Sequence, residues 1–144
     1  MLNVVAAVIH NTQGQILIAQ RPLEKHQGGL WEFAGGKVDA NETPAHVLVR
    51  ALQEELDITA TQYRSLLTVE HHYPDKSVRL QVFRVTAFEG EAHGAEGQPT
   101  VWVNPEQLQN YAFPAANTPI LKAAVLPTAY YITPEADEIE GDLL

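Results

Sequence analysis

The stretch from Gly36 to Ile58 constrains this chain most strongly, because it joins a glycine segment to an acid-bearing amphipathic helix. Thr43 suits the N-cap of that helix, and Pro44 suits its first position. Apolar residues recur close to helical spacing, so one face of the helix is expected to pack on a core: Ala45, Leu48, Leu52 and Leu56. Another face then carries Glu54 and Glu55.

The acidic face of this helix indicates a metal site. Positions 51, 54 and 55 are separated by three and four residues, so carboxylates at all three would crowd together unless a cation lay between them. Position 51 is alanine in this chain, and Glu54 and Glu55 remain. A solvated acidic helix face without a ligand is the alternative interpretation, because such faces are common.

This stretch resembles the Nudix box, a motif of glycine, glutamate, arginine and apolar residues at set spacings. The positions that match it are Gly36, Glu42, Arg50, Leu52, Glu54, Glu55 and Ile58. Ala51 and Asp57 depart from it, since the motif has glutamate and glycine there. We expect Glu42 and Arg50 to form a structural pair that holds the loop to the helix. Asp57 is expected to tolerate the left-handed conformation that glycine would adopt at the helix end.

The resemblance extends to the MutT branch of the Nudix family over residues 2 to about 125. It is carried by short segments in the same order: Arg21, Trp31–Gly36, Tyr73–Lys76, Gly90–Glu91, Glu96–Pro99 and Phe113–Asn117. It implies Mg²⁺-dependent hydrolysis of nucleoside triphosphates to the monophosphate and pyrophosphate, and removal of oxidised purine nucleotides such as 8-oxo-dGTP. Mn²⁺ is an alternative cofactor.

The same resemblance assigns roles to individual residues. Three carboxylates would be catalytic and would bind the metal together with the Gly35 carbonyl: Glu54, Glu55 and Glu96. Four residues would contact the substrate: Arg21, Phe33, Asp75 and Asn117. A guanidinium suits phosphate oxygens, and an amide that both donates and accepts suits a purine edge. A plain surface arginine, and an asparagine placed only for the following helix turn, are the alternatives for Arg21 and Asn117.

Ala51 leaves the catalytic outcome open, because the family assigns the glutamate at this position as metal ligand and general base. Losing a general base typically costs a factor on the order of 10² to 10⁴ in rate. Three interpretations stay open. The protein is a slower enzyme, or it is a nucleotide-binding module that no longer hydrolyses, or the alanine is a deliberate change made to trap substrate.

The composition limits which classes of binding partner and metal site are possible. The 144 residues fit one domain, and a net charge of −9 argues against binding long nucleic acid or an anionic membrane through a broad basic surface. The chain has no cysteine, so a disulfide or a cysteine-ligated metal is excluded. The apolar start, Leu2–Ile9, is too short to span a bilayer and predicts a strand of a cytoplasmic protein. The oligomeric state is not decided by the sequence.

The element pattern predicts an α+β architecture, a mixed and largely antiparallel sheet with helices packed on it. The resemblance implies that this is the Nudix fold, with the Nudix-box helix and a C-terminal helix on the sheet. Two hairpins are expected, from 2–9 with 16–19 and from 63–73 with 78–88. Short strands are expected over 30–36 and 100–103, and helices over about 104–110 and 118–125. The Nudix domain would span 1–126.

Residues 127–144 form a tail beyond the predicted domain. Its segment from Tyr130 to Pro134 resembles the first strand of a thiamine-phosphate-synthase-like barrel, which implies the start of a truncated second domain. An ordinary tail laid along a sheet edge is the alternative.

Overall fold

A computed structural model describes residues 1–24, 28–114 and 117–124. The expectation for the tail, 127–144, lies outside these residues. The elements follow the chain in this order: β1 (Leu2–Ile9), β2 (Ile16–Gln20), β3 (Trp31–Glu32), β4 (Gly35–Lys37), α1 (Pro44–Leu56), β5 (Thr59–His72), β6 (Ser77–Glu89), β7 (Thr100–Val103), the 3-10 helix η1 (Pro105–Asn110) and α2 (Thr118–Ala124).

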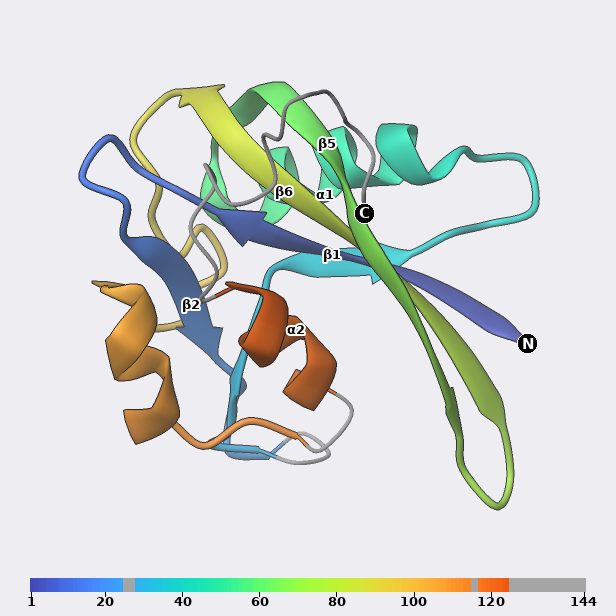
Figure 1. The fold of residues 1–144 in the computed structure, drawn as a ribbon. Coiled ribbons are helices and arrows are strands. Elements are labelled where there is room, and N and C mark those ends of the chain that lie inside the picture. The colour runs from blue at the N-terminus through green and yellow to red at the C-terminus, as the bar shows by residue number, and fades with distance from the viewer. Residues whose placement is uncertain (25–27, 115–116, 125–144) are drawn as a thin grey trace, which may run out of the picture.

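The strands form two sheets. The larger has the order β4-β1-β6-β5, with β1 parallel to β6 and the other pairs antiparallel. The smaller is antiparallel throughout and has the order β3-β2-β7. In Figure 1, the β5–β6 hairpin extends well beyond the body of the larger sheet. The second predicted hairpin and the α+β architecture are therefore confirmed.

The first predicted hairpin is wrong, because β1 and β2 lie in different sheets. The turn between them contains an isolated antiparallel bridge between His10 and Ile16 and a backbone hydrogen bond from Asn11 N–H to the Gln15 carbonyl. One edge of β1 pairs with β6 along its whole length, and on the other edge Val4, Val5 and Ala6 pair with β4 rather than with β2.

The single strand predicted over 30–36 is also divided. Its first part is β3 in the smaller sheet, and its last part continues into β4 in the larger one. Phe33 and Ala34 lie between the two strands, and their side chains point into different cores. The segment therefore carries the chain from one sheet to the other, directly before the Nudix-box loop.

Two apolar cores lie on the two faces of β1. Val5, Ala7 and Ile9 join the core beneath α1, whereas Ala6 and Val8 join the core beneath α2 and η1. Figure 1 shows α1 and α2 on opposite sides of β1. A strand buried on both faces reads as a continuous apolar run, which explains the composition of β1. Within the described residues, no helix is both long enough and apolar enough to cross a membrane.

Candidate functional site

A cavity of about 850 Å³ opens where the two sheets meet the end of α1. Its walls come from β1, β2, the 32–37 segment, the last turn of α1, the 96–99 loop and the chain before α2. Six of the residues predicted for the site line it: Arg21, Phe33, Gly35, Glu55, Glu96 and Asn117. Segments far apart in the sequence are thus brought to one cavity.

Helix α1 carries Glu55 to this cavity, and both helix ends are fixed as the sequence predicted. The Thr43 hydroxyl accepts a hydrogen bond of 3.1 Å from the backbone N–H of His46, and Pro44 is the first helical residue. Asp57 adopts the left-handed conformation, with φ 59°, and its N–H bonds the Gln53 and Leu52 carbonyls. Leu48, Leu52 and Leu56 are buried in the core.

Glu55 occupies an environment that disfavours its charge. The pKa of its carboxyl is raised to about 7, first by burial and then, in this order, by the nearby charges of Glu96, Glu32 and Glu54. A backbone hydrogen bond from Gly35 acts in the opposite direction. A cation bound beside Glu55 would offset both the desolvation and the repulsion between these carboxylates.

The loop after β6 brings Glu96 to Glu55. The backbone N–H of Ala95 donates to the Glu55 carbonyl at 2.9 Å, and that of His93 donates to the Leu56 carbonyl at 3.2 Å. These bonds attach the loop to the end of α1. Glu96 itself is exposed and lines the cavity.

Gly35 is required by the close approach of β4 to β1. A Cβ built on Gly35 would lie 1.8 Å from the carbonyl oxygen of Val5, so no larger residue fits there without a backbone shift. The glycine therefore allows this part of the cavity wall to form beside Glu55.

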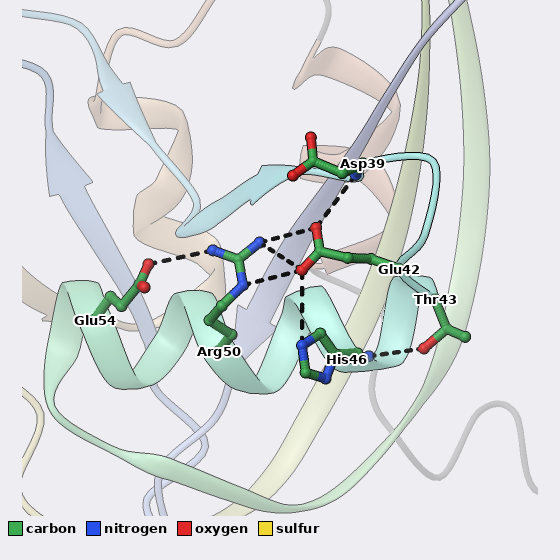
Figure 2. Close-up of polar contacts among 6 residues, drawn as sticks. All are labelled: Asp39, Glu42, Thr43, His46, Arg50 and Glu54. Carbon is green, nitrogen blue, oxygen red and sulfur yellow. Dashed lines mark hydrogen bonds and ion pairs between the residues drawn. The ribbon is translucent and has the colours of Figure 1, made fainter.

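Glu54 does not line the cavity. Its side chain is 59% exposed and lies 3.4 Å from the Arg50 guanidinium. Arg50 also donates two hydrogen bonds of 3.2 Å to the Glu42 carboxylate, and Figure 2 shows both acids around this guanidinium. A bond from the Asp39 backbone lowers the pKa of Glu42, and Arg50 lowers it further. The predicted structural pair of Glu42 and Arg50 is therefore confirmed.

Ala51 is a buried residue of α1 whose side chain faces β4. It is 3% exposed, and a Cβ built on Gly36 would lie 3.6 Å from its methyl group, at ordinary contact distance. The methyl group of Ala51 thus belongs to the helix–strand packing.

Arg21 and Glu32 pair at the cavity wall, where Nη1 of the arginine donates to the carboxylate at 2.8 Å. Glu32 belongs to the segment Trp31–Gly36 that resembles MutT, but the sequence predicted no role for it. The sequence feature that could have indicated a role is its position next to Phe33, in a strand that leads into the Nudix box.

Asn117, directly before α2, and Phe33, between β3 and β4, both line the cavity and both contact the segment 113–114. The Asn117 N–H donates to the Pro114 carbonyl at 3.0 Å, and the Phe33 ring stacks on Phe113 at 5.3 Å between centroids. Asp75 lies elsewhere, exposed in the turn between β5 and β6 and outside the cavity lining. The substrate role given to Asp75 stays a prediction.

The donor set at the cavity fits a hard divalent cation in chemistry, since Glu55, Glu96 and the Gly35 backbone offer oxygen ligands. Across residues 1–24, 28–114 and 117–124, no three acidic, histidine or cysteine side chains are gathered closely enough to hold a metal as they stand. Ligation by Glu54 would require its side chain to leave Arg50.

Comparisons with known proteins agree with this fold and site. Residues 5–123 match the sequence profile of the family described as NUDIX domain. The chain is 46% identical over 96 residues to the 8-oxo-dGTP diphosphatase of Proteus vulgaris, a match that covers 67% of this chain and 86% of that protein. It is 41% identical over 123 residues to the CTP pyrophosphohydrolase of Escherichia coli, covering 85% and 90%.

Comparison with solved structures points to the same family. A solved structure from work on MutT of Aliivibrio salmonicida and Vibrio cholerae aligns with a TM-score of 0.75 at 37% identity, covering 86% of this chain and 95% of that one. A profile that spans most of the chain, relatives of similar length and a shared fold lead to one assignment. This chain belongs to the Nudix family of nucleotide pyrophosphohydrolases.

Proposed function

We propose that this protein hydrolyses nucleoside triphosphates to the monophosphate and pyrophosphate with Mg²⁺, and that 8-oxo-dGTP is its main substrate. The observation that carries the proposal is one cavity lined by the carboxylates of Glu55 and Glu96, the guanidinium of Arg21 and the amide of Asn117. The carboxylates suit a divalent cation, the positively charged guanidinium suits phosphate oxygens, and the amide suits a nucleobase. These are the groups that this reaction needs.

The reaction breaks one phosphoanhydride bond. Water adds its hydroxyl to one of the α and β phosphorus atoms and gives up its other proton to solvent. The bridging oxygen leaves with the other of these two phosphorus atoms, which gives the monophosphate and pyrophosphate. Bound Mg²⁺ supplies neutralisation of the phosphate oxygens and a lower pKa for the attacking water. Glu55 and Glu96, with the Gly35 carbonyl, would hold the cation, and Glu54 would join them only if its side chain left Arg50.

Arg21 contributes on the substrate side. Its guanidinium donates to Glu32 at the cavity wall, and a guanidinium offers paired donors that suit phosphate oxygens. Asn117 offers a donor and an acceptor together, which suits the edge of an oxidised guanine, and Phe33 forms part of the apolar wall. Nucleotide pools of the cytoplasm are where such a substrate arises, so we place the protein there.

A nucleotide-binding module without turnover is the second candidate. It is favoured by Ala51, which removes a carboxylate from the Nudix-box helix and is buried against β4. The remaining acids at the cavity would hold the cation and nucleotide without a general base. The same cavity thus supports both candidates up to the chemical step.

Turnover measurements separate the two candidates. Pyrophosphate release is measured across a Mg²⁺ titration with 8-oxo-dGTP, dGTP, CTP and a sugar nucleotide, for the starting protein, Ala51→Glu and Ala51→Gln. We expect Mg²⁺-dependent turnover that is fastest with 8-oxo-dGTP. We expect Ala51→Glu to raise kcat by a factor on the order of 10² to 10⁴, because it restores a general base.

Ala51→Gln is the matched control, because it has the size of glutamate without the charge. An equal gain in both variants would assign the effect to packing rather than to a base. Tight nucleotide binding with no turnover in any version would favour the binding module. Faster turnover of CTP than of 8-oxo-dGTP would overturn the proposed substrate and leave the reaction in place.

A further inference from the structure

The side chain of Gln98 joins the two acids that the cavity brings together. Its Nε2–H donates to the backbone carbonyl of Glu55 at 3.0 Å. Its Oε1 accepts from the backbone N–H of Glu96 at 3.0 Å. The side-chain amide of Gln98 therefore connects the last turn of α1 to the loop, because its nitrogen donates to one and its oxygen accepts from the other.

The surrounding backbone gives this bridge a fixed place. The last carbonyls of a helix have no partners within it, and the Glu55 carbonyl accepts from both Ala95 N–H and Gln98. The loop closes tightly on itself, since a Cβ built on Gly94 would lie 1.9 Å from the Gln98 carbonyl oxygen. Gln98 is half-buried, whereas Glu96 beside it is exposed.

Two carboxylates of like charge repel one another, and an exposed loop is free to yield to that repulsion. The backbone bonds of Ala95 and His93 hold the base of the loop, on the side before Glu96. On the other side, the Gln98 side chain holds Glu96 by accepting a hydrogen bond from the backbone N–H of Glu96. Without that bond, Glu96 would be tied to the helix on one side only.

We propose that Gln98 is a positioning residue that sets the separation of Glu55 and Glu96 and so prepares them to share a divalent cation. The inference rests on the proposed function, since it assumes that these acids bind metal. A simultaneous donor and acceptor is needed, which glutamine supplies and which methionine of similar length does not. Residues that orient metal ligands typically contribute about 10- to 100-fold in metal affinity.

The test is direct Mn²⁺ binding to the metal-free protein, followed by the electron paramagnetic resonance signal of free Mn²⁺. We expect Gln98→Met to weaken binding by about tenfold or more. His93→Ala is the matched control, because His93 lies in the same loop and its ring nitrogen lies 3.3 Å from the exposed carboxylate of Asp57. This control should bind Mn²⁺ within about threefold of the starting protein.

A double-mutant cycle separates positioning from general loop damage. If Gln98 acts through Glu96, then Gln98→Met should add little to the loss already caused by Glu96→Gln. Circular dichroism checks that each variant is folded. Gln98→Asn, which keeps both polar groups on a shorter stem, should show the same loss and decides the matter if the methionine variant does not fold.

The outcomes are distinct. Binding by Gln98→Met within threefold of the starting protein, or a full additive loss in the cycle, would overturn the positioning role while leaving the proposed function intact. Absence of both Mn²⁺ binding and nucleotide turnover in the starting protein would overturn the proposed function, and with it this inference.

Discussion

Glu55 lies where burial and neighbouring acids act together on one carboxyl group. Its position in the last turn of α1 places it against the β4 backbone, and Glu96 and Glu32 lie near enough to oppose its ionisation. Glu54, the next residue back, points instead to Arg50 and solvent. Adjacent glutamates in one helix therefore have different electrostatic environments, because a helix turns about 100° per residue.

Glu55 is expected to make stability depend on pH in the metal-free protein. Its folded pKa of about 7 lies above the ordinary value of 4.5, so the folded state holds the proton more tightly than the unfolded chain. The resulting stabilisation is present below pH 4.5 and is lost as pH rises to about 7. Relative to Glu55→Gln, the starting protein should lose roughly 1 to 3 kcal/mol over that window.

Urea unfolding at several pH values, with a chelator present, checks this expectation. Glu54→Gln is the comparison, because Glu54 is exposed and paired with Arg50. Stability curves of the starting protein and Glu55→Gln that stay parallel across this pH window would contradict the assigned environment of Glu55.

Helix α1 is held at both ends by groups outside its own backbone. Thr43 caps the first turn, and the left-handed Asp57 closes the last. The loop that carries Glu96 then bonds the Glu55 and Leu56 carbonyls. The end of the helix and the wall of the cavity are thus one structural unit, so changes at the cap are expected to reach the site.

Asp57→Ala should lower the free energy of unfolding by about 1 kcal/mol, because alanine has no side-chain oxygen to favour the left-handed conformation. Asp57→Gly should not show this loss, since glycine adopts positive φ readily. Thermal and urea unfolding of both variants provide the measurement. His93→Ala reports separately on the contact between Asp57 and His93. Equal losses in the alanine and glycine variants would show that backbone conformation is not the cause.

Arg84 ties the molecule together across its larger sheet. It lies on β6, is fully buried, and its guanidinium contacts His10 Nε2 at 2.9 Å and the Ala123 carbonyl at 3.3 Å. The end of β1 and helix α2 therefore meet at one cation. Burial and the charge of Arg84 lower the pKa of His10 to about 4.

The contact at His10 predicts a loss of stability in acid. Its folded pKa lies below the ordinary 6.5, so its contribution is present above pH 6.5 and is lost as pH falls toward 4. After allowance for partial solvent exposure, this loss is roughly 1 to 2 kcal/mol. His10→Gln, which still accepts a hydrogen bond from Arg84, should remove that part of the acid sensitivity in urea unfolding. An unchanged pH profile in this variant would rule out His10 as its source.

Much of the local structure could be predicted from sequence. The caps of α1, its buried leucines, the pair of Glu42 and Arg50 and the β5–β6 hairpin follow from residue type and short-range spacing. Strand pairing could not be predicted so well. The expected β1–β2 hairpin failed because pairing was decided by β4 and β6, which come from distant parts of the chain.

The sequence by itself determined the helix, its acids and the family resemblance, because these depend on neighbours along the chain. Only the tertiary structure decided that Glu55 rather than Glu54 lines the cavity, and that Gln98 bridges Glu55 and Glu96. Those relations depend on burial and on hydrogen bonds between residues some forty positions apart, for example 43 for Gln98 and Glu55. The spacing within a motif carries no information about such contacts.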